Sequence, residues 1–428
     1  MKPFLTALSF AAVAISALGA DANGTPTYAR DVARIVQKNC EGCHRPGQIG
    51  PFSLTNYQEV SAFAPEIKKA VQERRMPPWH AVPGHGDFKN ERRLSDSDVQ
   101  TLARWIDAGA PQGNRKDLPP PVKHNDDWAL GNPDAVIAPG VSFEIEASGV
   151  DEYRCFVIPT TYEENRTIQA IEVRPGNRKV VHHVLVYSDT SGRARQLDAA
   201  DPRPGYSCFG GLGFQPQSGL GGWAPGAVPG RLPDDVGRFL PKGADVVMQV
   251  HYHKNGKPET DRSSLGLHFN RQLARRHFRS RPILNIGIRI PPDAENHRET
   301  AYWIANQDLL AYSITPHMHL LGKEMLVTAT FPDGTKKDLV WAKPYDFNWQ
   351  TSYVFKEPFV LPKGTRIDVT GYFDNSAKNA KNPSNPLREV RWGEGTTDEM
   401  LIGWLGYIAD AAAPASPTPA RTSAGGVQ

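Results

Sequence analysis

The sequence predicts a multidomain protein in which a small all-α domain is followed by two antiparallel, jelly-roll-like β-sandwich domains. Helical periodicity is confined to residues 27–111, whereas residues 125–410 contain short β-type runs separated by Gly, Pro, Asn and Asp. The 38 glycines and 37 prolines suit many short strands joined by turns. A chain of 428 residues is long enough for roughly two to four domains that each bury a core.

Composition excludes several broad classes of protein. With 39% hydrophobic and 22% charged residues, the chain is neither a disordered protein nor a bundle of membrane helices. A formal net charge of +3, with no stripe of Lys and Arg, excludes nucleic acid as a partner.

Residues 1–22 have the pattern of an export signal, with Lys2 at the start, an apolar run and the small-x-small site Ala20-Asp21-Ala22. A short membrane anchor is the alternative, but the apolar run from Phe4 to Leu18 is shorter than the ~20 residues needed to span a bilayer. We therefore expect an exported protein without a transmembrane segment, in the bacterial periplasm or secreted.

The helical domain is expected over residues 27–111. Tyr28–Lys38 has an apolar helical face, and a second helix should start at Ser95 and stop before Gly109. Residues 112–124 contain three consecutive prolines and are predicted to form a stiff linker.

The β-rich region is long enough for two sandwiches. Typical runs are Lys179–Tyr187, Asp245–His253 and Glu324–Phe331. We place the first sandwich at 125–285 and the second at 286–410, with the boundary beside the Arg-rich stretch 275–281. Residues 411–428 are dominated by Ala, Pro, Ser, Thr and Gly and are predicted to be a disordered tail.

Cys40-Glu41-Gly42-Cys43-His44 is a CxxCH motif, in which Cys40 and Cys43 attach haem covalently and His44 ligates its iron. Half of a zinc site is the alternative, but the next cysteine after Cys43 is Cys155. The motif therefore predicts one covalently bound haem c. Residues 27–111 resemble small class I c-type cytochromes.

The sixth iron ligand is predicted to be Met76, because Pro77 and Pro78 hold it on a rigid loop and a thioether would raise the haem potential. Ligation by His80 and a five-coordinate iron are the alternatives. A domain of this kind carries electrons but selects no substrate, so the chemistry must lie elsewhere in the chain.

Six of the thirteen histidines occur as pairs within or beside predicted strands: His182-His183, His251-Tyr252-His253 and His317-Met318-His319. Residues two apart in a strand share a face, so His317 and His319 can bind one metal while Met318 points away. His182 and His183 can share a metal only if the strand bulges there. A core histidine satisfied by hydrogen bonds is the alternative, and we favour it for His253.

Imidazole ligands alone are compatible with zinc, copper, iron or nickel. The sequence has no HExxH motif of a zinc hydrolase, and neither Cys155 nor Cys208 has the neighbourhood of a blue-copper ligand. Copper is favoured, because a soft thioether beside histidine stabilises Cu(I).

The β-rich region also resembles the type II copper monooxygenases, the family of peptidylglycine α-hydroxylating monooxygenase and dopamine β-monooxygenase. The motifs that carry this resemblance, over residues 125–410, are Val181-His182-His183-Val184-Leu185-Val186, Met248-Gln249-Val250-His251-Tyr252-His253, His317-Met318-His319-Leu320-Leu321-Gly322-Lys323 and Thr396-Thr397-Asp398-Glu399-Met400. The resemblance implies two sandwiches that face each other across a solvent-filled cleft and hold two copper ions.

Carried over to this sequence, the resemblance implies an electron-storing copper on the first sandwich, held by His182, His183 and His251. It implies an oxygen-activating, catalytic copper on the second, held by His317, His319 and Met400. Met325 is the rival sulfur ligand, although we expect it to be a core residue of the following strand.

Cys155 and Cys208 remain after haem attachment. A disulfide is the default in an oxidising compartment, two free buried thiols being the alternative. The resemblance implies a bridge in this part of the first sandwich, which would tie a strand to the loop Gly205–Pro229.

The sequence departs from the peptide-hydroxylating relative at Thr315, where that enzyme has a basic residue that grips a peptide carboxylate, and at Ile402 and Trp404, which replace polar residues. We therefore expect a small apolar or aromatic substrate. The implied reaction is hydroxylation of a C–H bond with O2, with electrons passing from an external donor through the fused haem. The alternatives are a haem and copper electron carrier, or a protein that oxidises its substrate and passes electrons outward.

Overall fold

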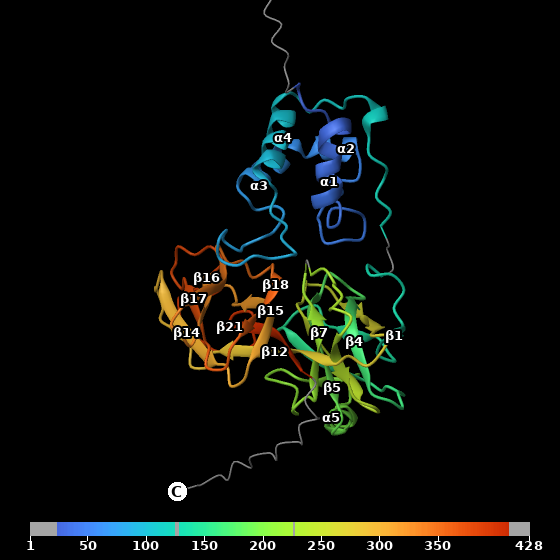
Figure 1. The fold of residues 1–428 in the computed structure, drawn as a ribbon, viewed down its shortest axis with the longest axis vertical. Coiled ribbons are helices and arrows are strands. Elements are labelled where there is room, and N and C mark those ends of the chain that lie inside the picture. Colours follow the sequence, from blue (N-terminus) through green and yellow to red (C-terminus); the bar gives the residue numbers. More distant parts are fainter. Residues whose placement is uncertain (1–23, 125–127, 226, 411–428) are drawn as a thin grey trace, which may run out of the picture.

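The computed structural model describes residues 24–124, 128–225 and 227–410, and in them the chain forms a small helical block and a larger β-rich body (Figure 1). The predicted export signal and the predicted tail lie outside the described residues. No helix within these described ranges combines the length and the apolar character needed to cross a membrane.

The helical block contains short helices whose bounds are η1 Tyr28–Val32, α1 Ala33–Asn39, α2 Tyr57–Ala62, α3 Ala64–Gln72 and α4 Asp96–Asp107. Helix α4 begins as predicted, with the Ser95 side chain accepting a hydrogen bond from the backbone of Asp98, and Gly109 follows it with a positive φ of 81°. Trp105 and Leu102 of α4 are fully buried against Val32 of η1. That this block is a cytochrome domain stays a prediction.

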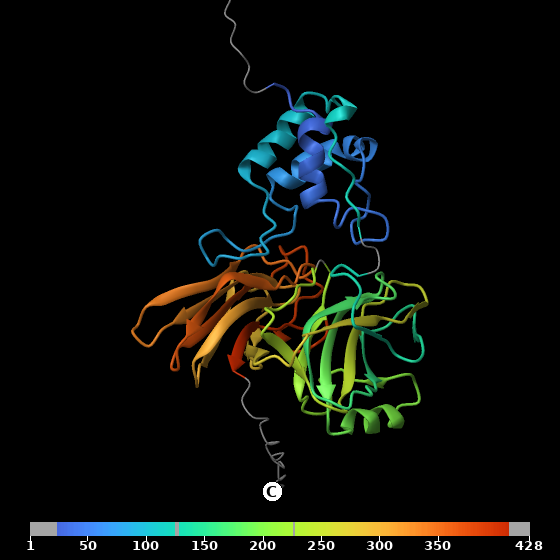
Figure 2. The same ribbon diagram turned by 45° about the vertical axis from the view of Figure 1, so that its right-hand side comes forward.

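One segment of the predicted helical domain packs elsewhere. After α3 the chain descends to the β-rich body (Figures 1 and 2). There Trp79, Ala81 and Phe88 are buried in the core of the second sandwich. Backbone bridges join Ala81 to Ala342 and Phe88 to Phe355. The expectation that all of 27–111 forms one domain is therefore wrong for this segment, because its large apolar residues find a better-packed environment on the sheet.

The linker contains a single turn of 3₁₀ helix, η2 Arg115–Asp117, before the first strand. The first sandwich consists of one helix and eleven strands: β1 Ala135–Ile137, β2 Phe143–Ile145, β3 Glu152–Ile158, β4 Arg166–Arg174, β5 Val181–Asp189, α5 Arg193–Ala200, β6 Tyr206–Ser207, β7 Ser218–Trp223, β8 Val236–Leu240, β9 Asp245–Tyr252, β10 Glu259–Asp261 and β11 Ser264–Phe269. A sheet in the order β6-β3-β9-β5-β7 faces the strands β1-β11-β4-β8 across a core of aliphatic and aromatic residues.

The second sandwich consists of the remaining ten strands: β12 Arg276–Leu284, β13 Arg289–Ile290, β14 His297–Ile304, β15 Leu309–His317, β16 Gly322–Thr330, β17 Lys336–Ala342, β18 Tyr353–Leu361, β19 Arg366–Phe373, β20 Val390–Arg391 and β21 Ile402–Asp410. The sheet β14-β19-β16-β17 faces the strands β12-β21-β15-β18 over the largest apolar core of the described chain. The prediction of a β-sandwich architecture is confirmed.

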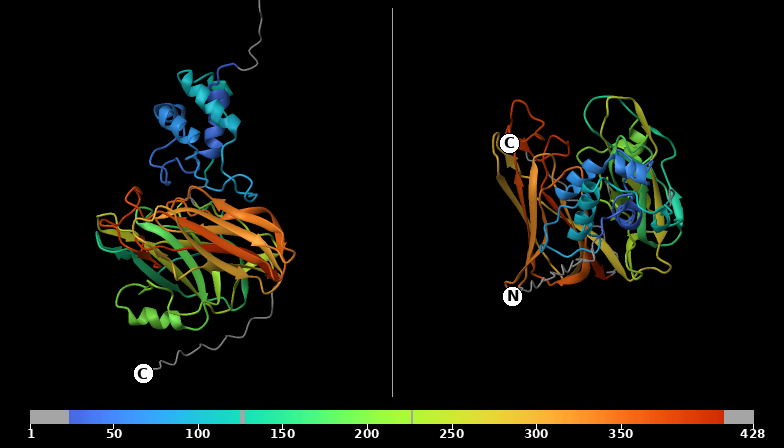
Figure 3. Two further views of the ribbon diagram at one scale, coloured as in Figure 1. Left: turned by 90° about the vertical axis from the view of Figure 1, so that its left-hand side faces the viewer. Right: turned by 90° about the horizontal axis from the view of Figure 1, so that it is seen from above.

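The two sandwiches share one sheet. Strand β12 pairs along its whole length with β21 and runs parallel to the start of β8, so that eight strands form a continuous sheet through both sandwiches. Figure 3 shows the two sandwiches side by side. By this pairing β12 belongs to the second sandwich, whereas the sequence placed residues up to 285 in the first. Continuity of the sheet gives the two sandwiches a fixed relative position.

The disulfide between Cys155 and Cys208 is present. It joins β3 to the turn after β6, within the loop that the sequence expectation named. The buried Arg154 beside it pairs with Asp201 and donates to the carbonyl of Gly205 at the start of this loop.

Candidate metal centres

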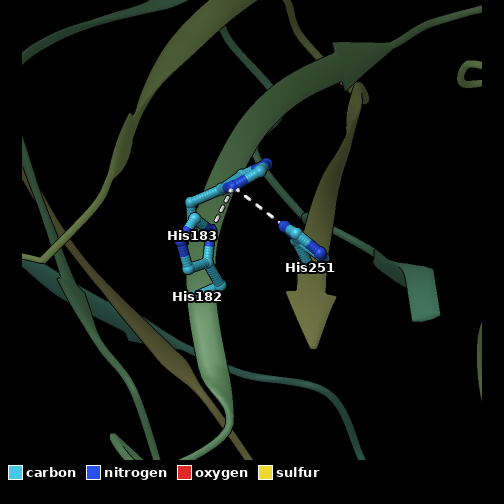
Figure 4. Close-up of side chains that lie close together, drawn as sticks. All are labelled: His182, His183 and His251. Atoms are coloured by element: carbon cyan, nitrogen blue, oxygen red, sulfur yellow. Dashed lines mark hydrogen bonds between the residues drawn. The ribbon is translucent and has the colours of Figure 1, made fainter. Parts of the chain in front are cut away.

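The first group of histidines lies on two adjacent strands of the first sandwich. His182 and His183 come from β5 and His251 from β9, and their potential ligand atoms all lie within 4.8 Å of one another (Figure 4). The pairing of β5 with β9 shifts register between Val181 and His183. This irregularity is the bulge that the adjacent pair requires, and it brings the three histidines together. That they hold a metal stays a prediction.

The nitrogens that converge are the Nδ1 atoms. His182 Nδ1 and His251 Nδ1 each lie 3.3 Å from His183 Nδ1. His251 donates from Nε2 to Asp151 Oδ2 at 3.0 Å, which leaves the lone pair of its Nδ1 directed at the other two rings. Tyr153 stacks on His251 with ring centroids 4.2 Å apart and fixes the plane of that imidazole.

The surroundings of the first group lower the pKa of both histidines from β5. Burial, followed by repulsion from His251, lowers the pKa of His182 to about 3, and the same causes place the pKa of His183 well below its usual value. The imidazoles of His182 and His183 are therefore neutral at physiological pH, which is the form that ligates metals.

The second group lies at the end of β15. His317 is the last residue of the strand and His319 follows it, with ring centroids 5.2 Å apart and planes at 88°. His317 Nδ1 donates to Gln350 Oε1 at 2.9 Å, and His319 Nδ1 donates to the backbone carbonyl of Asp398 at 3.1 Å. Both rings therefore keep Nε2 free for a metal. Burial lowers the pKa of His317 to about 4 and that of His319 to about 3.

Met318 points away from the two histidines, as strand alternation predicts. Its side chain is fully buried in the core of the second sandwich, and Tyr345 bonds to its backbone N–H and carbonyl through one hydroxyl group. Met325 is also fully buried in this core, on β16. Met325 therefore has the position of a core residue that the sequence expectation gave it.

Met400 is held next to the second group by its neighbour Glu399. One carboxylate oxygen of Glu399 accepts the backbone N–H groups of both His319 and Met400, at 2.9 and 3.1 Å. In the antiparallel pairing of β15 with β21, His317 lies opposite Ile402, so Met400 comes two residues before the strand that pairs with the end of β15. Its ligation of a metal stays a prediction.

Phe347, in the loop between β17 and β18, contacts both groups. Its ring stacks on His182 with centroids 5.0 Å apart and meets His319 edge-on at 5.4 Å. The two groups of histidines therefore face each other with one aromatic ring between a member of each. The cleft implied by the resemblance is filled at this point by a side chain.

The CxxCH motif follows α1. Cys40 and Cys43 form no disulfide, and His44 donates from Nδ1 to the backbone carbonyl of Phe52 at 3.1 Å, which leaves Nε2 free. A side chain at Gly50 would collide with the His44 ring, so a glycine is needed for the loop to pass it. Two reduced thiols beside an oriented histidine are the donor set that a covalently attached haem requires.

Met76 and His80 lie in different surroundings. Met76 follows α3, where its backbone N–H bonds to Ala70. His80 packs against the second sandwich, where its carbonyl accepts the N–H of Lys343 and its side chain lines a small pocket with Pro316. The choice of Met76 as sixth iron ligand stays a prediction.

No family model matches this chain. The DBH-like monooxygenase protein 2 of Mus musculus is 27% identical over 224 residues, which are 46% of this chain and 34% of the mouse protein. The chain is thus distantly similar to a DBH-like monooxygenase. The match spans about a third of that relative's length.

The solved structures that match this chain are only weakly similar to it. PNGF-II is 11% identical with a TM-score of 0.28, over 64% of this chain and 65% of that protein. The VP2 subviral particle of infectious bursal disease virus is 8% identical with a TM-score of 0.18, over 68% and 80%. Neither carries an argument about this protein.

His253 is a correction to the sequence expectation. It was expected to be a core histidine, but its side chain is 60% exposed and bonds through Nδ1 to Asp151. The residue ends up outside the core because β9 stops at Tyr252.

Four residues of the site were missed as functional by sequence reasoning: Asp151, Phe347, Gln350 and Glu399. Glu399 lies within the motif that ends at Met400, and its place there was the available signal. The other three contact histidines that are distant in the sequence, as with Asp151 and His251, which are 100 residues apart. No local pattern identifies such contacts.

Proposed function

We propose that this protein is an exported, copper-dependent monooxygenase that hydroxylates a C–H bond of a small organic substrate with O2. The convergence of three histidines through a strand bulge is the observation that carries the proposal. The distant similarity to a DBH-like monooxygenase supports it. The disulfide supports an oxidising compartment.

The donor sets fit copper. The first site offers three imidazole nitrogens from His182, His183 and His251. In the second, His317, His319 and Met400 would provide two imidazoles and a thioether, which suit a copper ion that alternates between Cu(II) and Cu(I). Copper bound at these two sites would supply the single electrons that activate O2. The overall reaction consumes RH, O2, two electrons and two protons and gives ROH and water.

The chain's own side chains orient these ligands and shape the place for the substrate. Asp151, Gln350 and the carbonyl of Asp398 each hold one ring nitrogen, so that the opposite nitrogen is directed at the metal. The face of the sheet beside His317 also carries Trp404, because Thr315 lies opposite Trp404 and residues two apart share a face. An apolar or aromatic substrate fits this wall.

The helical block would hold haem through Cys40, Cys43 and His44, with Met76 as the proposed second iron ligand. The packing of His80 on the second sandwich favours Met76 over His80. A haem held in this way would supply single electrons from an external donor. Its covalent connection to the copper sites raises the effective concentration of that donor.

The test combines metal analysis with product analysis. We expect two coppers and one haem per chain, and with 18O2 we expect one labelled oxygen atom in a hydroxylated product. Haem that stays reduced during product formation would contradict its role as donor. Haem that becomes reduced on adding substrate without O2 would instead support oxidation of the substrate with electrons passing outward.

A further inference from the structure

Asp151 is a partly buried carboxylate that contacts both halves of the β-rich body. It lies just before β3, with its side chain only 14% exposed. Its oxygens accept hydrogen bonds from His251 at 3.0 Å, from His253 at 2.9 Å and from the hydroxyl of Thr396 at 2.6 Å. Thr396 is 245 residues away in sequence and belongs to the second sandwich, in the loop that leads to Met400.

Two further bonds tie the same loop to the first sandwich. The hydroxyl of Tyr153, whose ring stacks on His251, donates to the carbonyl of Glu394 at 2.9 Å. The backbone N–H of Gly210 donates to the Glu394 carboxylate at 2.8 Å. The loop 394–400 is thus bonded to strand β3, beside the first group of histidines, and to the loop that follows β6.

The other end of this loop holds the second group. The carbonyl of Asp398 accepts from His319 Nδ1, and Glu399 accepts from the backbone of His319 and Leu321. A continuous path therefore runs from His251 through Asp151 to Thr396, along two residues of chain to Asp398, and on to His319. This path connects the two groups of histidines through hydrogen bonds and two residues of backbone.

We propose that Asp151 and Thr396 are positioning residues that set the spacing between the two metal centres. This inference rests on the proposed function, because it assumes two metal centres. Asp151 and Thr396 would act through the ligands and would not touch the reacting atoms. Spacing matters since the substrate must meet activated oxygen at one centre while the second electron arrives from the other. A misplacement of ~1 Å in such an arrangement costs about 100-fold in rate.

The test uses Thr396→Val, which keeps the shape of the side chain and removes only the hydroxyl bonded to Asp151. The matched control is His253→Ala, which removes another bond to the same carboxylate but leaves the link to the second sandwich intact. Pulsed EPR on the copper-loaded oxidised protein measures the distance between the two Cu(II) ions. Hydrogen–deuterium exchange on the metal-free protein measures protection of the amides in residues 394–400.

In Thr396→Val we expect two bound coppers, a longer and broader distance distribution, faster exchange in 394–400 and a turnover number reduced by up to about 100-fold. His253→Ala should match the wild type in distance and exchange. As a second variant, Asp151→Asn should reproduce the change in distance and also alter the EPR spectrum of the first centre, because His251 loses its charged partner.

An unchanged distance and unchanged exchange in Thr396→Val would overturn the inference while leaving the proposed function intact. A wild-type protein that binds fewer than two coppers would instead contradict the proposed function. The inference is therefore tested on the Thr396→Val variant, and the proposed function on the copper content of the wild-type protein.

Discussion

The ring of Phe347 lies nearly parallel to the imidazole of His182, with centroids 5.0 Å apart and 19° between the planes. Phe347 is 8% exposed and belongs to the core of the second sandwich, whereas His182 belongs to the first. An aromatic side chain from one sandwich thus forms part of the wall around the proposed ligands of the other. The first centre therefore depends on contacts from both sandwiches.

Replacing Phe347 with leucine should weaken copper binding at the first centre. A stacked aromatic pair contributes ~0.5–1.5 kcal/mol, so the Kd for copper there should rise by a factor of about 2 to 10. Calorimetric titration of metal-free protein measures it. Phe239→Leu is the control, since Phe239 stacks in the same way on His277, which is not a proposed ligand. Equal effects of both variants would contradict a role at the centre.

Met400→Ala should remove the only sulfur ligand proposed for copper. We expect the sulfur shell in the X-ray absorption spectrum of the Cu(I) protein to disappear and hydroxylation to be lost, because imidazoles alone stabilise Cu(I) less well. Copper at the first centre and the haem spectrum should not change. Met325→Leu serves as the control, since it keeps the core volume. Normal turnover of Met400→Ala would transfer the ligand role to Met325.

Gln350→Leu should lower copper affinity at the second centre by about 10- to 100-fold, the usual effect of removing the partner of a ligating histidine. The reason is that His317 Nδ1 loses the acceptor that fixes its ring. Copper competition with a chelator measures this affinity. Asn348→Ala, in the same loop but bonded only to Asp346, should retain normal affinity.

Glu399→Ala should destabilise the metal-free protein. The Glu399 carboxylate accepts three backbone N–H groups, from His319, Leu321 and Met400, and each buried group left unpaired costs ~1–3 kcal/mol. We expect the free energy of unfolding in urea to fall by about 3 kcal/mol or more. Glu389→Ala should change it by less than about 1 kcal/mol, because the Glu389–Arg391 pair is exposed.

Cys43→Ala together with Cys40→Ala should abolish covalent haem attachment. Haem should then be extracted by acidified acetone, whereas in the wild type it remains with the polypeptide. Replacing Cys155 and Cys208 by alanine should leave haem attachment intact, because those residues form the disulfide in the first sandwich. Haem retention by the Cys40/Cys43 variant would contradict the assignment of the motif.

Features set by short-range spacing could be predicted from the sequence. The cap at Ser95 and the opposite orientations of Met318 and His317 follow from local geometry. For His182 and His183 the local geometry gave only the condition, a bulge, under which the two could converge. These rules need only the neighbouring residues and the period of the backbone.

Features that depend on distant contacts could not be predicted. The membership of β12 in the second sandwich rests on its pairing with β21, more than 100 residues later, and the packing of Trp79 rests on a partner surface formed by β17 and β18. The roles of Asp151 and Phe347 likewise appear only when both sandwiches are in place.

The location of Trp79 has a practical consequence for dissecting this protein. The indole packs against Tyr353 and Phe88, so a fragment that starts in the linker 112–124 would lack part of its own hydrophobic interior. A fragment that contains both sandwiches must begin upstream of Trp79 to keep the core of the second sandwich complete. Since the chain leaves the helical block for this excursion and returns at Leu94, that block is anchored at several points and cannot swing freely as it would on a single hinge.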